Sequence, residues 1–197
     1  MSKGRLEAFS DGVIAILITI MVLELKAPEG VDLSALGPMI PVFLAYVLSF
    51  IVLGIYWNNH HHMFHATERI NGAILWANLH LLFWLSLVPA VTAWIGESSS
   101  APVPTAVYGA VLLMAGVAYY ILTRTIVRHL GPHSAIAIAV GKDMKGLVSV
   151  VLYAAAIPLA FVSRWAADAI YVAVVLMWLV PDRRIESKLS ANGHKIG

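Results

Sequence analysis

The 197-residue chain alternates long hydrophobic runs with short polar segments. A helix needs roughly 20 apolar residues to cross a hydrocarbon core of about 30 Å, and several of the runs approach that length. The pattern therefore predicts an all-α integral membrane protein with six transmembrane helices. They cover about residues 5–25, 38–64, 70–95, 105–127, 146–162 and 166–180. A further apolar stretch, residues 135–140, is too short to span the bilayer.

The basic residues indicate the orientation of these helices. Six crossings place both termini on one side, and all but Lys26 and Arg164 of the 13 Lys and Arg residues then lie on that side. Because cytoplasmic loops carry the excess of Lys and Arg, we expect both the N- and the C-terminus to be cytoplasmic. Residues 1–182 would form the transmembrane domain, and residues 183–197 a short basic cytoplasmic tail.

Composition supports the membrane class. The chain is 60% hydrophobic and 12% charged, whereas soluble domains are about 45–50% apolar and about 25% charged. The net charge of +2 follows from the membrane topology and gives no reason to expect a nucleic-acid partner. The chain has no cysteine, which excludes disulfides, thiolate catalysis and Cys-ligated zinc. Glu7 and Asp11 interrupt the first apolar run, so we expect a retained helix and not a signal peptide.

The first predicted helix is unusual because it carries Asp11, Thr19 and Glu24 in an otherwise apolar run. A carboxylate at membrane depth is costly and normally faces the interior of a helix bundle or a water-filled path. We therefore expect this helix to be the central one, with the others packed around it.

The first helix has two distinct faces. At 100° per residue, Ile16, Thr19, Ile20 and Leu23 fall on one stripe, and Asp11 lies about 140° from Ile16. Asp11 and the stripe therefore cannot face the same surface. If Asp11 points into the bundle, the stripe faces either lipid or another copy of the chain, and helix geometry leaves both interpretations open.

Polar residues of the first three predicted helices should meet in one layer near the cytoplasmic side. Antiparallel neighbours bring the start of the first helix, the end of the second and the start of the third to a similar depth, and buried polar groups need partners. The residues concerned are Ser10, Asp11, Trp57, His60, His61, Asn71, Asn78 and His80. The layer could hold the helices together, or form a proton relay or an ion-coordinating site.

Histidines offer a rival interpretation. His61 and His65 are four residues apart, as are His129 and His133, and histidines at such spacing bind metal in membrane desaturases and hydroxylases. Those enzymes use more histidine boxes than this chain offers, and a Gly-Pro pair breaks the helix between the second two histidines. A membrane metalloenzyme is therefore a secondary alternative, and we assign no metal ligand, cofactor or catalytic residue.

Three motifs resemble those of the transmembrane protein 175 family, the endosomal and lysosomal potassium channel and its bacterial homologues. The first helix begins with Arg5-x-x-x-Phe9-Ser10-Asp11. The second contains Trp57-x-x-His60-His61-x-x-Phe64. The third contains Asn78-x-x-Leu81-Leu82-Phe83-x-x-Ser86-Leu87-x-Pro89-x-x-Thr92. No motif of the family is matched in the second half of the chain.

The resemblance implies a bacterial inner-membrane channel with one six-helix repeat. Four copies would form a homotetramer in the lipid bilayer, and the first helix of each would line a central pore for monovalent cations, K⁺ above all. It implies a constriction at Ile16, Thr19 and Leu23 in place of a carbonyl filter. The structural and gating core would comprise Arg5, Phe9, Ser10, Asp11, Trp57, His60, His61 and Asn78.

The expected mechanism is weak selectivity for K⁺ over Na⁺. An apolar ring penalises the loss of water from an ion, K⁺ loses its water more easily than Na⁺, and a ring of Thr19 hydroxyls could replace part of that water. A small secondary transporter is the alternative, since Pro89 and Pro158 could break two helices. These prolines do not occupy matching positions in two halves of the chain.

Overall fold

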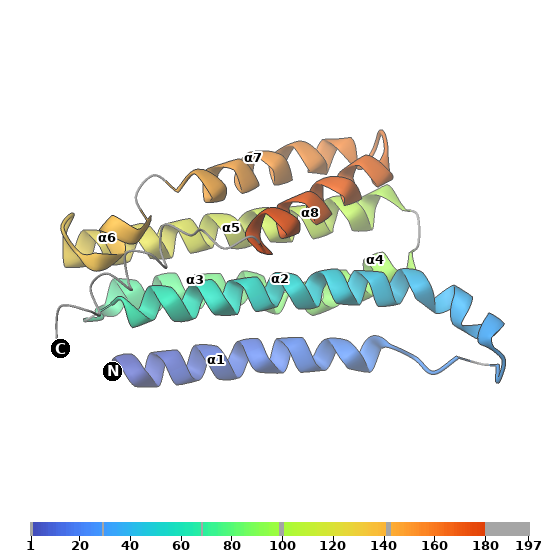
Figure 1. The fold of residues 1–197 in the computed structure, drawn as a ribbon, viewed down its shortest axis with the longest axis horizontal. Coiled ribbons are helices and arrows are strands. Elements are labelled where there is room, and N and C mark those ends of the chain that lie inside the picture. Colours follow the sequence, from blue (N-terminus) through green and yellow to red (C-terminus); the bar gives the residue numbers. More distant parts are fainter. Residues whose placement is uncertain (1, 29, 68, 99–100, 141–142, 180–197) are drawn as a thin grey trace.

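The computed structural model describes residues 2–28, 30–67, 69–98, 101–140 and 143–179, which form roughly antiparallel helices along one long axis (Figure 1). This part of the chain is all-helical, as predicted. The helices are α1 (Lys3–Ile20), α2 (Ile40–His65), α3 (Gly72–Ser86), α4 (Val88–Glu97), α5 (Pro102–Leu130), α6 (Ala135–Val140), α7 (Met144–Leu159) and α8 (Arg164–Leu179). Two 3-10 segments, η1 (Met21–Glu24) and η2 (Leu33–Met39), lie between α1 and α2.

Within the described residues, four helical segments are long and apolar enough to cross a membrane. They span Lys3–Glu24, Leu33–His65, Gly72–Glu97 and Pro102–Leu130, with 22, 33, 26 and 29 residues, and they confirm the first four predicted spans. Helices α7 and α8 have 16 residues each, or about 24 Å at 1.5 Å per residue. The count of six crossings therefore remains a prediction, and so does the cytoplasmic side of the termini. Residues 183–197 lie outside the described part.

Two breaks in the helices have identifiable causes. The predicted third helix is interrupted at Leu87, between α3 and α4, because Pro89 has no N–H and its ring displaces the carbonyl four residues earlier. Helix α5 ends before Gly131, whose φ of 91° is a left-handed conformation that glycine adopts without strain. This second break removes His129 and His133 from a common helical face, as expected from the Gly-Pro pair.

Helix α1 lies at one edge of the subunit, on the opposite side from α7 (Figure 1). It contacts α2, α3 and α4, and only 22% of its apolar window is buried, compared with 50% for α5. The expectation that the first helix is central is therefore wrong for the single subunit. Helix α5 occupies that position, in contact with α3, α4, α7 and α8. The prediction assumed that a helix with several polar residues must be surrounded by other helices. A helix at the edge satisfies them as well, because Ser10 needs only one buried face and Asp11 has a partner at the rim of the subunit.

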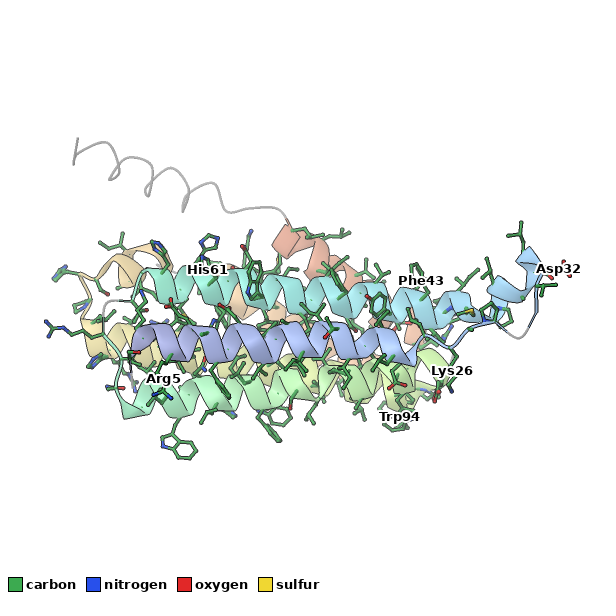
Figure 2. All side chains as sticks on the ribbon, turned by 90° about the horizontal axis from the view of Figure 1, so that it is seen from below. Arg5, Lys26, Asp32, Phe43, His61 and Trp94 are labelled. Carbon is green, nitrogen blue, oxygen red and sulfur yellow. The ribbon has the colours of Figure 1, made fainter. Side chains whose placement is uncertain are left out.

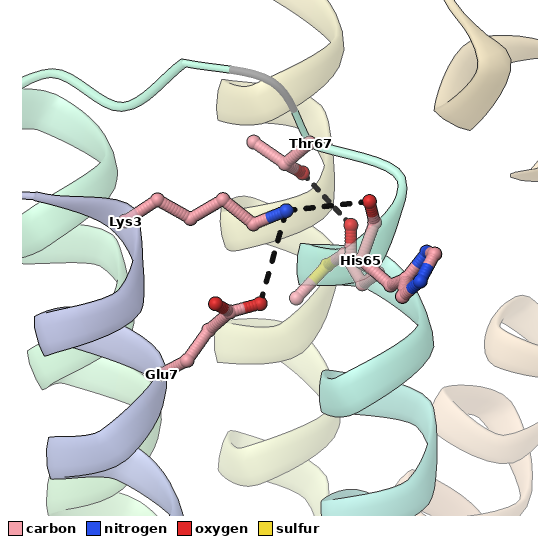
Figure 3. A network of polar contacts seen from close by, with 5 residues as sticks. Lys3, Glu7, His65 and Thr67 are labelled. Atoms are coloured by element: carbon pink, nitrogen blue, oxygen red, sulfur yellow. Dashed lines mark hydrogen bonds and ion pairs between the residues drawn. The ribbon is translucent and has the colours of Figure 1, made fainter.

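Polar contacts fasten both ends of α1. At its start, the Lys3 ammonium donates to the His65 carbonyl oxygen at 3.3 Å and lies 3.9 Å from the Glu7 carboxylate (Figure 3). There it meets the negative end of the α2 helix dipole. Beyond η1, Lys26 and Glu97 form an exposed ion pair at 3.0 Å. The hydrogen bond to the Glu97 carboxylate and its charge raise the pKa of Lys26.

The packing of α8 against α5 depends on a glycine. The Tyr171 hydroxyl of α8 donates to the Thr105 carbonyl oxygen of α5 at 2.9 Å, and Tyr171 is completely buried. The hydroxyl lies directly over Gly109, where a Cβ would overlap it. Small residues at helix contacts allow such close approach in membrane proteins.

We expect Gly109→Ala to lower the free energy of unfolding by about 1–3 kcal/mol, because the added methyl group overpacks the contact with Tyr171. The measurement is denaturant unfolding in detergent micelles. Gly54→Ala is the matched control, since a Cβ there meets nothing within 4 Å. Adding Tyr171→Phe to Gly109→Ala should recover part of the loss; purely additive costs would contradict the proposed overlap.

Candidate functional site

One face of α1 is left uncovered by the rest of the described subunit. Ile16 is 62% exposed and Leu23 is 76% exposed, and Thr19 between them is also exposed. Figure 2 views the subunit from this side, with α1 in front of its neighbours. Arg5 and Phe9 are exposed on the same helix. The three predicted constriction residues therefore share an uncovered surface, as the helical stripe requires.

The Thr19 hydroxyl lies 3.0 Å from the carbonyl oxygens of both Ala15 and Ile16. Its single hydrogen is donated to its own helix, which satisfies the donor at membrane depth. The oxygen lone pairs of Thr19 remain available to accept a hydrogen bond from water or to coordinate a cation. Leu23 lies in η1, where the turn is 120° per residue, so its place on the stripe differs slightly from the α-helical expectation.

The opposite face of α1 contributes to a buried hydrogen-bond network. The Ser10 hydroxyl donates to the Leu6 carbonyl oxygen at 2.9 Å and accepts from Asn78 Nδ2 at 2.9 Å. Asn78 Oδ1 lies 2.8 Å from His60 Nε2. Because this amide oxygen is an acceptor, His60 must donate from Nε2. The network joins α1, α2 and α3, and its three polar side chains are at most 1% exposed. We name it the Ser10–Asn78–His60 network.

Asp11 belongs to a separate group at the rim of the subunit. Its carboxylate accepts from the Trp57 indole N–H at 3.1 Å, and the Trp57 ring stacks on His61, with centroids 6.2 Å apart. Trp57 and His61 are both exposed. Sequence reasoning placed Asp11, Trp57 and His61 in the same layer as Ser10 and His60, whereas the structure forms two groups.

The other residues of the expected polar layer form hydrogen bonds outside these two groups. Asn71 accepts from the Ile74 N–H at the start of α3, and its amide nitrogen lies 3.1 Å from His129 Nδ1. His80 accepts from the Trp84 indole within α3. Arg5 and Phe9 lie on the exposed face of α1 and not in either group.

A second buried polar cluster was missed by the sequence analysis. The Ser49 hydroxyl lies 3.0 Å from the Tyr108 hydroxyl and 2.6 Å from the Thr92 hydroxyl. These residues join α2, α4 and α5 toward the opposite end of the bundle from the start of α1. The argument from antiparallel depth, applied to the other ends of the second and third helices, could have found Ser49 and Thr92.

No group of three or more His, Asp or Glu side chains suited to a metal ion occurs among the residues described. His61 and His65 lie on one face of α2 with ring centroids 6.3 Å apart, and the break at Gly131 separates the other pair. Structural zinc sites take four ligands and catalytic ones three. This geometry gives the metalloenzyme alternative no support.

We expect Asn78→Leu to lower the free energy of unfolding by about 1–3 kcal/mol, because it leaves the buried donor of His60 without an acceptor. Asn58→Leu on the exposed side of α2 is the control, with an expected change within about 0.5 kcal/mol. Adding His60→Phe to Asn78→Leu should cost less than the sum of the single changes, measured by unfolding in detergent. Equal losses for Asn78→Leu and Asn58→Leu would contradict the network's role.

Comparisons with known proteins identify relatives of this chain. Residues 5–89 match the family model for the endosomal/lysosomal potassium channel TMEM175. A potassium channel of Chryseobacterium sp. (strain P1-3) is 53% identical over 98% of this chain and 100% of its own length. A potassium channel of Streptomyces collinus is 40% identical over 62% of this chain and 66% of its own length.

A solved structure extends the match over nearly the whole chain. The crystal structure of a lysosomal potassium-selective channel TMEM175 homolog from Chamaesiphon minutus aligns with a TM-score of 0.78 at 31% sequence identity. The alignment covers 90% of this chain and 96% of that one. With its apolar spans, this multi-pass membrane protein therefore belongs to the TMEM175 channel family.

Proposed function

We propose that the protein is a potassium-permeable channel in which four copies surround a pore lined by α1. The observation that carries this proposal is the uncovered face of α1, with Ile16 62% and Leu23 76% exposed in the single subunit. A symmetric assembly around this face would bring Ile16, Thr19 and Leu23 of each copy toward one axis. The potassium-channel names of the relatives support the choice of ion. Six crossings, cytoplasmic termini and a bacterial inner membrane complete the proposal.

The chemistry of the stripe suits a dehydrating constriction. Ile16 and Leu23 are separated by about 10 Å along the helix, and Thr19 lies between them. An apolar ring forces an ion to lose part of its hydration shell, and this dehydration costs K⁺ less free energy than Na⁺. The lone pairs of Thr19 would replace part of the lost water, as carbonyl oxygens do in other filters. No cofactor takes part in this scheme, and K⁺ is the cargo.

A carrier mechanism has one observation in its favour, the helix break at Leu87 between α3 and α4. Secondary transporters bind substrate at paired discontinuous helices in two related halves. Pro158 lies in the last turn of α7 and does not interrupt that helix, so α7 does not supply the second discontinuous helix that a carrier would need. Unitary currents in single-channel recordings distinguish the two, because a carrier does not produce them.

Thr19→Val should reduce the K⁺/Na⁺ permeability ratio about threefold, because it removes the hydroxyl oxygen that each subunit offers to the ion at the constriction. The free energy lost is comparable to that of one hydrogen bond. The ratio is measured from reversal potentials in planar bilayers with asymmetric KCl and NaCl. Thr125→Val is the matched control, since Thr125 is partly exposed on α5 and donates to the carbonyl oxygen of Ile121, four residues earlier. An unchanged ratio in Thr19→Val would exclude Thr19 from the filter.

Ile16→Asn should raise the unitary conductance and reduce selectivity, because a polar ring holds water where an apolar ring expels it. Val151→Asn is the control, since Val151 is 58% exposed on α7, away from α1. Both are recorded in reconstituted bilayers at the same protein density. A conductance of Ile16→Asn equal to that of the unmodified channel would place the narrow point elsewhere.

A further inference from the structure

The charged residues near the start of α1 face two different directions. Lys3, Glu7 and Asp11 lie about 140–180° around the helix from Ile16. On that side Lys3 pairs with Glu7 and with a carbonyl oxygen at the end of α2, and Asp11 accepts from an indole of α2. Arg5 lies only about 20° from Ile16. Arg5 therefore belongs to the uncovered face of α1, whereas the other three charges belong to the face that meets α2.

Arg5 has no partner within the subunit. It is exposed, and no hydrogen bond or ion pair joins it to any residue in the described part of the chain. Figure 2, which looks onto the uncovered face, labels it at the start of α1. Arg5 precedes Ile16 by about 16 Å along the helix axis. Because a guanidinium stays protonated in proteins, Arg5 adds a permanent positive charge to this end of the face.

The other end of the uncovered face has the opposite sign. There Leu23 is followed by Glu24, which is exposed. Lys26, two residues further, is paired with Glu97 at 3.0 Å. The two ends of the face therefore differ in charge, positive at Arg5 and negative at Glu24.

We propose that four Arg5 side chains form a cationic ring at the mouth of the pore where α1 begins, and that this ring makes K⁺ permeation asymmetric. The proposal rests on the four-copy pore lined by α1. Between the ring and Ile16, Gly12 has no neighbour within 4 Å of the place of a Cβ. The ring therefore acts on hydrated ions at a wide mouth, and the constriction itself is unchanged.

The size of the effect follows from the number of charges and from salt screening. Four unit charges about 10 Å from the axis, in water at 0.1 M salt, lower the local K⁺ concentration about threefold. K⁺ that enters from the Arg5 end therefore carries less current than K⁺ that enters from the Glu24 end. At 1 M salt the screening length falls to about 3 Å, and the difference should disappear.

The test uses unitary currents of the purified protein in planar bilayers with equal KCl on both sides. The chain has no cysteine, so Arg5→Cys gives a single site for thiol reagents. A trimethylammonium methanethiosulfonate restores the positive charge, and a sulfonate methanethiosulfonate introduces a negative one. The chamber from which a reagent acts identifies the Arg5 end of each inserted channel. Arg128→Cys is the matched control, because Arg128 is exposed in the last turn of α5, outside the uncovered face of α1.

In 0.1 M KCl we expect the current that enters from the Arg5 end to be about threefold smaller than the current in the opposite direction, and the ratio to approach one in 1 M KCl. Arg5→Gln should remove the difference, and Arg5→Lys should retain it. In Arg5→Cys the positive reagent should restore the difference and the negative reagent should reverse it. Neither reagent should change the currents of Arg128→Cys.

Equal currents in both directions for the unmodified protein in 0.1 M KCl, an unchanged ratio in Arg5→Gln, or the same effect of both reagents would overturn the proposal. Loss of unitary currents in Arg5→Gln and Arg5→Cys, with currents retained in Arg5→Lys, would overturn it as well and assign Arg5 to a contact between copies. An unmodified protein without unitary currents would contradict the proposed function itself, and the ring with it.

Discussion

The arrangement of α1 depends on the hydrogen bonds that Asn78 makes to Ser10 and to His60. All three side chains are buried where no solvent competes, so each lost partner leaves an unpaired polar group. Asn78 therefore fixes how α1 is rotated about its own axis relative to α2 and α3. Once Ser10 is turned inward, the face with Ile16, Thr19 and Leu23 must turn outward. This buried amide, together with the buried apolar residues Leu6, Ile14 and Leu17 of the same helix, determines which residues the subunit presents on its uncovered side.

Much of this was predictable from the sequence because it follows from helical periodicity. The four long spans follow from the length of the apolar runs, and the two faces of α1 follow from which residues lie 3 or 4 positions apart. The edge position of α1 does not. It depends on how α5 packs against four other helices, through contacts such as Tyr171 over Gly109 that no local pattern reveals. Asp11 does bind Trp57, as the expected layer requires, but it does so at the rim of the subunit, where an indole donor satisfies a carboxylate without burying it.

The sequence analysis missed the Ser49–Tyr108–Thr92 cluster and the cavity that residues of α2, α5, α7 and α8 line, for different physical reasons. The cluster brings together single hydroxyl residues of α2, α4 and α5, and a Ser or Thr hydroxyl can satisfy itself within an isolated helix, as Thr92 does on Val88. The cavity is defined by space that side chains leave empty, and a one-dimensional pattern contains no information on empty space. Helix α5 contributes Gly116 and Tyr119 to its lining, and a glycine in a membrane helix more often marks close helix packing.

Helix α2 connects these two regions of the subunit. Tyr56 faces the cavity, whereas Trp57, the next residue, donates to Asp11 of α1. Asn59 lines the cavity, whereas His60, the next residue, completes the network with Asn78. A helix turns as a rigid unit, so a rotation of α2 that moves Tyr56 also moves Trp57 and changes its distance to Asp11. Helix α1 contributes no residue to the cavity between α2, α5, α7 and α8, yet both the uncovered face of α1 and this cavity take their geometry from this turn of α2.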